Sequence, residues 1–203
     1  MKLRLFLALL LAGTAAAADF DLLITNARIA DGSGKPLVNG SIGVKGGKIV
    51  AVGQIEGTAD QIIDAGGKVA APGFIDVHTH SEDICLIPAA ENFLRMGVTT
   101  IVTGNCGHSR TDVAKFFQEI EESKVALNVG TLIGHGSVRE QGMGGSFIRA
   151  PNAEQLAMMK GLVDQAMKEG AVGLSTGLIY VPGSFAKTDE LIELAKVAAA
   201  HDG

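Results

Sequence analysis

Short runs that alternate apolar and polar residues dominate the first third of the chain. They cover residues 22–25, 41–45, 48–52, 62–63 and 69–70, and glycine-rich turns separate them. Such runs are typical of half-buried β-strands. The pairs Gly46-Gly47 and Gly66-Gly67 each supply the two positive φ angles that a two-residue hairpin turn requires, so each pair predicts a hairpin. We therefore expect residues 19–72 to form a small β-sandwich segment.

After Pro72 the pattern changes to an alternation of strands and helices. The segments expected as strands are residues 74–80, 98–103, 125–133 and 171–174. One expected helix has a single apolar face made of Val113, Phe116, Phe117 and Ile120, which recur at helical spacing. The other expected helices cover residues 89–96 and begin at Asn152, which forms a capping box with Gln155, and at Thr188. This alternation predicts an α/β fold with a parallel sheet.

The strand-helix unit occurs four times in residues 73–203, which is half of the eight units that close a barrel. The pattern therefore predicts the N-terminal half of a TIM-like (β/α)8 barrel. The first and fourth strands of such a half would have open edges, and open edges favour pairing with another chain. We expect either that the chain is the front part of a larger protein or that it associates with itself through these edges.

The N-terminus resembles a secretory signal. Lys2 and Arg4 precede an apolar stretch at residues 5–12, and small residues at 16–18 provide a cleavage site after Ala18. The apolar stretch is shorter than the roughly 20 residues that a membrane span needs. We expect residues 1–18 to be a signal peptide, the mature protein to be periplasmic or secreted, and no stable membrane anchor.

Composition narrows the possible partners. The 203 residues are 47% hydrophobic, enough for one sizeable core, and the formal net charge is −5 with no tryptophan. The sequence has no excess of positive charge that would attract nucleic acid, and it has few aromatic rings on which bases could stack. Nucleic-acid binding is therefore not expected. In an exported protein Cys85 and Cys106 suggest a disulfide, but its strict geometry makes the bridge the less favoured alternative.

Two histidines follow the first expected strand of the second segment. His78 and His80 are one strand period apart, so both imidazoles point to the same side, at the end of a barrel strand where active sites form. Imidazole is a common zinc ligand. A pair of solvated polar residues is an equally weighted alternative. Asp76 lies two residues below His78 on the same face, and we expect it to orient a histidine or the strand end.

Cys106 and His135 follow the next two expected strands. Glycines flank Cys106 in the run TGNCGH and allow the backbone to bend so that a thiolate can approach a metal ion. A small buried cysteine that only packs is the alternative, and the neighbouring histidine pair favours the ligand. For His135 we expect a supporting role near the site or a hydrogen-bonded structural position rather than direct ligation.

Three runs, PGFIDVHTH, GVTTIVTGNCGHS and GAVGLSTGLIYVPG, resemble in their order the N-acyl-D-amino-acid deacylases (D-aminoacylases) of the amidohydrolase superfamily. The resemblance implies a small β-sandwich beside a TIM-like barrel, zinc as the cofactor, and hydrolysis of N-acyl-D-amino acids. His78 and His80 match a pair that attends a weaker metal position, and Cys106 matches a thiolate ligand. Tyr180 matches a tyrosine that hydrogen-bonds the substrate carboxylate, although a packing role for this ring is equally supported.

The same resemblance implies that further site residues lie beyond Gly203. They are two metal-binding histidines on the fifth and sixth strands and an aspartate, the general base, on the eighth. We therefore expect this chain to be inactive by itself. Two other functions stay open: another amidohydrolase, such as a dipeptidase or a hydantoinase-like enzyme, against which the GNCG cysteine argues, and a non-catalytic metal-binding remnant.

Overall fold

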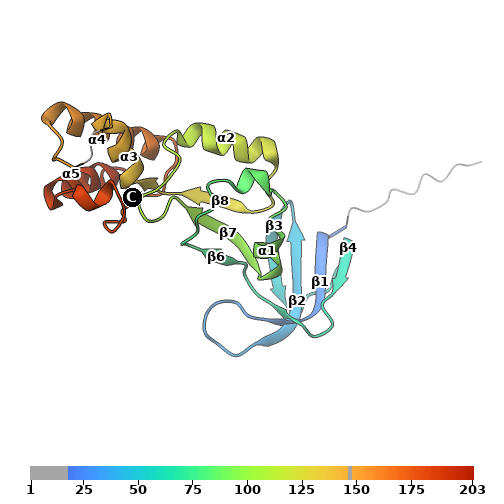
Figure 1. The fold of residues 1–203 in the computed structure, drawn as a ribbon. Coiled ribbons are helices and arrows are strands. Elements are labelled where there is room, and N and C mark those ends of the chain that lie inside the picture. Colours follow the sequence, from blue (N-terminus) through green and yellow to red (C-terminus); the bar gives the residue numbers. More distant parts are fainter. Residues whose placement is uncertain (1–17, 146–147) are drawn as a thin grey trace, which may run out of the picture. The chain divides into compact units, whose positions relative to one another are not determined.

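The structure is a computed structural model that describes residues 18–145 and 148–203 (Figure 1). The chain divides into two compact units, residues 1–72 and 73–203. Residues 1–17 lie outside the described part, so the signal peptide stays a prediction. Among the described residues, none of the helices has the length and apolar character needed to cross a membrane.

The described residues of the first unit form one five-stranded sheet. Its strands are β1 (Phe20–Ile29), β2 (Val38–Lys45), β3 (Lys48–Gly53), β4 (Ala59–Asp64) and β5 (Val69–Ala70). Their order is β3-β2-β1-β4, and β5 also pairs with β1. β2 and β3 are antiparallel, and Gly46 and Gly47 connect them with φ angles of 58° and 72°. The hairpin predicted at this glycine pair is confirmed.

The hairpin predicted at Gly66-Gly67 is wrong. β4 and β5 both run parallel to β1. They follow the same edge of β1 one after the other, because β1 is interrupted at Asn26, whose φ is 52° and whose carbonyl accepts a hydrogen bond from the Gly67 amide at 2.8 Å. The glycine turn thus moves the chain along β1 instead of reversing it. The described residues make one layer, so the predicted sandwich is not confirmed.

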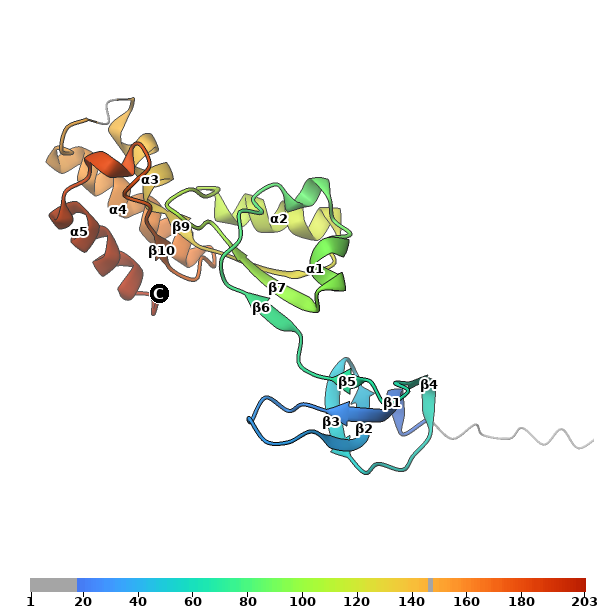
Figure 2. The same cartoon turned by 60° about the horizontal axis from the view of Figure 1, so that its bottom comes forward.

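The second unit alternates strands and helices, as the sequence predicts, and has a mixed α/β fold. Its elements are β6 (Phe74–Asp76), η1 (Ile84–Leu86), α1 (Glu91–Arg95), β7 (Val98–Thr103), α2 (Val113–Ser123), β8 (Asn128–Thr131), β9 (Ile133–Gly134), α3 (His135–Met143), α4 (Ala153–Lys168), β10 (Leu174–Ser175), η2 (Gly183–Phe185) and α5 (Thr188–Ala199). β6, β7 and β8 form one parallel sheet, and β9 and β10 form another (Figure 2). A continuous half-barrel wall is therefore not confirmed.

The first, third and fourth expected strands are shorter than predicted. β6 ends at Asp76, so His78 and His80 follow the strand instead of lying on it. The segment expected at residues 125–133 is split at Leu132 into β8 and β9, while main-chain hydrogen bonds from Leu132 to Thr103 and from Ile133 to Gly173, both 2.9 Å, continue the pairing across the split. α3 was not predicted. Its sequence is rich in glycine and its buried side includes Arg139, so it lacks an apolar helical pattern.

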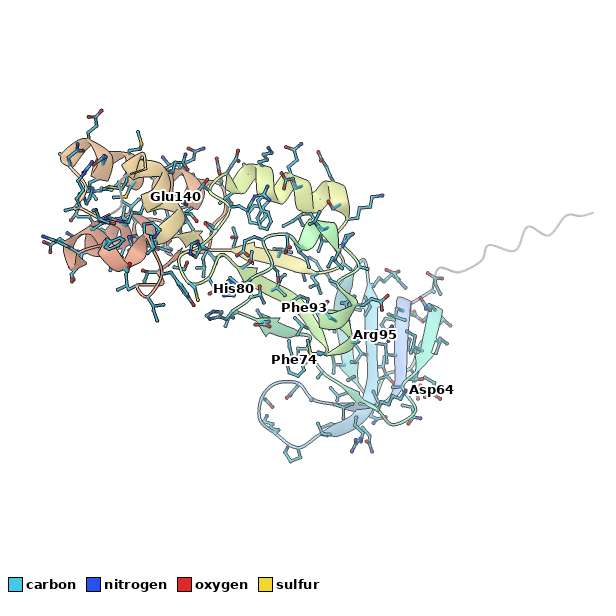
Figure 3. The ribbon with its side chains drawn as sticks, viewed as in Figure 1. Asp64, Phe74, His80, Phe93, Arg95 and Glu140 are labelled. Atoms are coloured by element: carbon cyan, nitrogen blue, oxygen red, sulfur yellow. The ribbon has the colours of Figure 1, made fainter. Side chains whose placement is uncertain are left out.

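Helices supply most of the core of the second unit. Val113, Phe116 and Ile120 of α2 are buried, as their spacing predicts, and Phe117 is partly buried. Phe93 of α1 packs against the same cluster as Phe116 (Figure 3). A second cluster joins α4 and α5, so each helix turns its apolar stripe toward the strands. Burying each such side chain contributes about 1.5 to 3 kcal/mol.

The capping box of α4 predicts a measurable change in stability. The Asn152 side chain accepts from the Gln155 amide at 2.8 Å, and the Gln155 side chain accepts from the Asn152 amide at 3.1 Å. Asn152→Ala should lower the free energy of unfolding by about 1 kcal/mol because a helix amide loses its acceptor. Asn152→Ser, which retains a capping oxygen, is the control. Equal urea midpoints for the two variants would contradict the assignment.

Candidate metal centre

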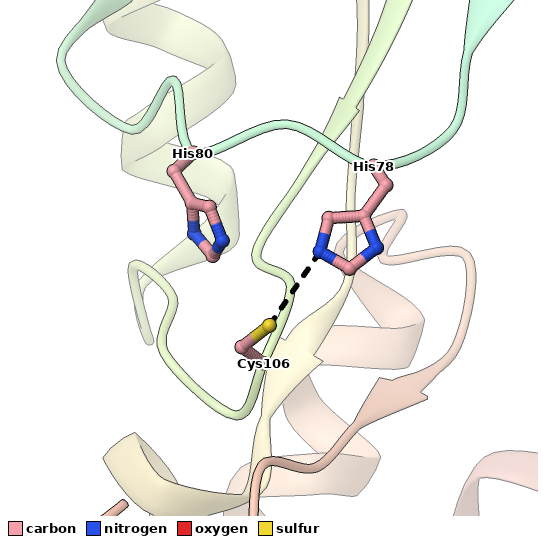
Figure 4. Close-up of side chains that lie close together, drawn as sticks. All are labelled: His78, His80 and Cys106. Carbon is pink, nitrogen blue, oxygen red and sulfur yellow. Dashed lines mark hydrogen bonds between the residues drawn. The ribbon is translucent and has the colours of Figure 1, made fainter.

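His78, His80 and Cys106 meet on one side of the second unit (Figure 4). Their ligand atoms all lie within 4.8 Å of one another, and Cys106 Sγ is 3.5 Å from His78 Nε2. Two ligand atoms of a tetrahedral zinc ion lie about 3.3 to 3.6 Å apart, given the usual zinc–nitrogen and zinc–sulfur bond lengths. Both histidines are exposed and Cys106 is partly buried. The thiol and imidazole donors therefore fit zinc. Cys85 and Cys106 are both free, so the less favoured disulfide is not present.

The histidine segment is held at its buried middle residue. Thr79 donates both its amide and its hydroxyl to the carbonyl of Val102 on β7, each at 3.0 Å. Thr79 is buried, while His78 and His80 on either side of it stay exposed. Asp76 accepts from the main-chain amide of His78 at 3.1 Å. Its carboxylate thus fixes the backbone where β6 ends, and the two imidazoles project together from the next residues.

Cys106 occupies a tight turn after β7. The amide of His108 donates to the carbonyl of Asn105 at 3.2 Å, and the φ angles of Cys106 and Gly107 are 55° and 81°. Two positive angles in succession are those of a type I′ turn. A left-handed cysteine costs roughly 1 to 2 kcal/mol, so the surroundings must hold it. Ser175 does so by accepting from the Gly107 amide at 3.0 Å and donating to the Gly104 carbonyl at 2.5 Å.

Glycines bring the ends of the other strands against this turn. A Cβ atom at Gly104 would lie 2.2 Å from the carbonyl oxygen of Leu132, and one at Gly177 would lie 2.2 Å from the carbonyl oxygen of Cys106. No side chain fits at such separations, so main chain contacts main chain directly. The segments that follow β7, β8 and β10 therefore gather around Cys106.

Tyr180 lies on the same rim. Its ring meets that of His108 edge to face at 6.1 Å between centroids, and a Cβ atom at Gly177 would lie 2.9 Å from Tyr180 Cδ2. The side chain is half exposed. No pattern in the sequence indicates that the two rings contact each other.

His135 is a buried structural residue. It begins α3 instead of ending a strand, it is fully buried, and its Nε2 lies 2.9 Å from Glu190 Oε1 of α5. Its Nδ1 lies 3.3 Å from the hydroxyl of Thr176, which precedes Gly177. Arg139, one helical turn further along α3, also donates to Glu190. His135 is therefore not grouped with the metal-ligand candidates, and it supports the rim from below.

The sequence analysis did not identify Glu190 and Arg139 as the buried partners of His135. Glu190 falls in the first turn of α5, where an acidic residue suits the helix dipole, so its sequence context indicates nothing more. Burial alone would raise the pKa of the Glu190 carboxyl. Hydrogen bonds from His135 and Arg139, together with the positive charge of Arg139, outweigh that effect and hold the pKa below its ordinary value.

Two other polar residues, Glu82 and Asn105, connect the histidine segment to the end of β7. Glu82 accepts from the Thr103 hydroxyl at 2.7 Å and from the Gly104 amide at 2.8 Å. The side chain of Asn105 is buried beside the same segment. Neither residue belongs to a periodic pattern, so sequence reasoning did not select them.

A family model described as "Amidohydrolase family" matches residues 61–202. Two similar curated proteins come from Alcaligenes xylosoxydans xylosoxydans. An N-acyl-D-glutamate deacylase is 37% identical over 89% of this chain and 42% of its own length. A D-aminoacylase is 34% identical over 91% of this chain and 43% of its own length. This chain thus spans less than half the length of these relatives.

Solved structures give the same similarity. The N-acyl-D-glutamate deacylase of Bordetella bronchiseptica, in complex with zinc and a phosphonate inhibitor that mimics the tetrahedral intermediate, superposes with a TM-score of 0.85. It is 35% identical, and the match covers 89% of this chain and 43% of that one. A D-aminoacylase crystal structure also gives a TM-score of 0.85, at 31% identity over 91% of this chain and 44% of that one.

The buried carboxylate predicts a pH-dependent stability. The pKa of the Glu190 carboxyl is lowered on folding. The contribution of Glu190 to the free energy of unfolding is therefore complete above the ordinary carboxyl pKa, and it is lost as the pH falls through the lowered pKa. At pH 7, Glu190→Gln should lower the free energy of unfolding by about 3 kcal/mol or more, since the buried Arg139 loses its ion pair with Glu190.

Glu193→Gln is the matched control, because Glu193 lies on the same helix but pairs with Lys160 and Lys196 at the surface. Such surface pairs contribute at most about 1 kcal/mol. Urea unfolding measured from pH 7 downward should give a shallower pH dependence for Glu190→Gln than for the parent. If the two substitutions lowered the free energy of unfolding at pH 7 by the same amount, the stabilising role assigned to the buried Glu190 carboxylate would be refuted.

Proposed function

Because the chain belongs to the amidohydrolase family, we propose that His78, His80 and Cys106 bind zinc in an enzyme that hydrolyses the amide bond of N-acyl-D-amino acids. The observation that carries the proposal is the convergence of a thiol with two imidazoles from two neighbouring strand ends. Sulfur and imidazole nitrogen are preferred zinc ligands. The exposure of both histidines leaves the proposed site open to a small molecule.

The choice of substrate class rests on similarity. The relatives named as D-aminoacylase and N-acyl-D-glutamate deacylase match along about nine-tenths of this chain, including the segments that carry His78, Cys106 and Tyr180. The cysteine in the GNCG turn supports this subgroup over other amidohydrolases. Since the chain spans less than half of these relatives, the activity is proposed for the whole enzyme.

The proposed mechanism divides the work among named residues. Zinc, when bound, supplies a Lewis acid that polarises the amide carbonyl. Cys106, as a thiolate after β7, would hold the ion, and His78 and His80, as neutral imidazoles after β6, would be its further ligands. Tyr180 donates a hydrogen bond from its phenol to the carboxylate of the amino acid and so orients the amide. In the family that the sequence resembles, an aspartate moves the proton from water to the leaving nitrogen.

We further propose that the protein is exported. The support is the charged start, the apolar stretch and the small residues at 16–18. A substrate such as an N-acyl-D-amino acid would then meet the enzyme outside the cytoplasm.

In the whole enzyme, Cys106→Ala should abolish retention of the tightly bound zinc and the hydrolysis of N-acetyl-D-methionine, because no other side chain supplies a thiolate to the three-residue cluster. His78→Ala should mainly reduce turnover. The control is Cys85→Ala, which removes the other free cysteine, near η1. Zinc content of dialysed protein and the initial rate are the measurements. A Cys106→Ala protein that stays fully loaded with zinc would refute the ligand assignment.

Tyr180→Phe should lower kcat/KM for N-acyl-D-amino acids about ten-fold, since losing a hydrogen bond to a charged group costs on the order of 1.5 to 3 kcal/mol. The control is the corresponding N-acyl-D-amino amide, which lacks the carboxylate, and for which parent and variant should differ little. If the ring only packs against His108, both substrates should be affected equally.

A further inference from the structure

Asn105 is the residue immediately before Cys106, and its side chain points away from the turn. Its Nδ2 lies 3.0 Å from the carbonyl oxygen of Val102, 3.3 Å from that of Thr79 and 3.4 Å from that of Val77. The last two carbonyls belong to the residues on either side of His78. The side chain is buried, with an exposed fraction of 7% for the residue. The Asn105 carboxamide thus contacts the main chain on both sides of His78, a metal-ligand candidate.

The main chain of Asn105 serves the other ligand-bearing segment. Its carbonyl accepts from the His108 amide and closes the turn in which Cys106 has a φ of 55°. A left-handed residue of this kind persists only where its surroundings over-determine it. Asn105 therefore has its side chain on the His78 segment and its carbonyl on the Cys106 turn. Cys106 Sγ and His78 Nε2, which belong to the two segments that Asn105 connects, are 3.5 Å apart.

We propose that Asn105 is a positioning residue for the metal centre, which holds the main chain of residues 77–79 at the distance from Cys106 that a shared ion requires. This inference rests on the proposed function, because it assumes that the cluster binds zinc. An amide is suited to the position because its NH2 group has two donors for the surrounding carbonyl oxygens. A carboxylate of the same shape would have only acceptors there.

Other hydrogen bonds also join the histidine segment to the end of β7. Glu82 bonds the end of β7 through the Thr103 hydroxyl and the Gly104 amide, and Thr79 bonds Val102. Removing the Asn105 side chain should therefore leave the strands paired while the His78 segment gains freedom relative to Cys106. Residues that orient metal ligands in this way typically change metal affinity by about 10- to 100-fold when replaced.

The test compares Co²⁺ binding by the purified parent protein and by Asn105→Ala, Asn105→Asp and His78→Ala. The thiolate-to-cobalt absorption band reports binding beside Cys106, and competition with a chelator gives the dissociation constant. Asn105→Ala should weaken by 10- to 100-fold the same binding step that His78→Ala weakens. Asn105→Asp should weaken it as well, because it keeps the volume but loses the donors.

Asn128→Ala is the matched control. The Asn128 carboxamide donates to the Thr99 carbonyl at 3.2 Å, at the other end of β7, so its loss removes a similar hydrogen bond far from the cluster. Its cobalt affinity should equal that of the parent. Thermal unfolding of the metal-free proteins separates loss of positioning from loss of fold.

The outcomes distinguish the inference from the proposed function. If the parent binds no cobalt beside a thiolate, the proposed metal centre is wrong. If the parent binds cobalt and a folded Asn105→Ala binds it as tightly as Asn128→Ala does, the proposed function stands and the positioning role is refuted. Failure of both Asn105 variants to fold would assign the residue to the fold itself and would also overturn the inference.

Discussion

The arrangement around the candidate site depends on direct contact between main chains. At Gly104 and Gly177 the peptide of one strand end lies where a side chain would otherwise stand, against Leu132 in one case and Cys106 in the other. Gly134 approaches the Gly107 carbonyl in the same way. The contacts position the sulfur of Cys106 through peptide geometry, which is stiffer than the packing of flexible side chains. The cysteine and the tyrosine share one rim because these peptides touch, while Thr79 joins the histidine segment to β7.

Polar groups support this rim from two depths. Beside the ligand candidates, the partly buried Ser175 and the buried Asn105 hydrogen-bond to the Cys106 turn and to the histidine segment. Deeper, Glu190 joins α5 to α3 through His135 and Arg139. Buried polar networks are favourable only when their members are satisfied, and here a carboxylate faces two donors. This buried ionic group reaches the segment after β10 through the contact of His135 with Thr176.

The sequence predicted those features that depend on local patterns. The apolar stripe of α2, the capping box of α4, the hairpin at Gly46-Gly47 and the order of the strands all have short-range signals, and the structure contains them. The rule that barrel sites lie at strand ends predicted the grouping of His78, His80 and Cys106. The strand periodicity used for the two histidines does not apply, because β6 ends at Asp76 before both of them. Their roles as ligands, and that of Tyr180, remain proposals that the structure is consistent with.

The remaining features depend on contacts between distant residues. The Gly66-Gly67 turn has the composition of a hairpin, and only the interruption of β1 at Asn26 decides that the chain continues forward. α3 carries glycines and a buried arginine, and Arg139 pairs with Glu190, which is 51 residues away along the chain. His135 was expected at a strand end because the helix that it begins was not recognised. The periodicity of apolar residues does not predict such contacts between residues that are far apart in the sequence.

The glycine contacts also limit how the chain can vary in length. An added residue in the segment after β10 would displace Gly177 from Cys106, and the sulfur would move with it, because no flexible side chain lies between the two peptides to absorb the shift. The connection between β1 and β2 is different, since Gly32 and Gly34 have open space around them and residues 31–37 are exposed. Insertions and deletions should therefore accumulate in that outer loop across related sequences, while the spacing from Gly104 to Gly107 and from Ser175 to Tyr180 stays constant.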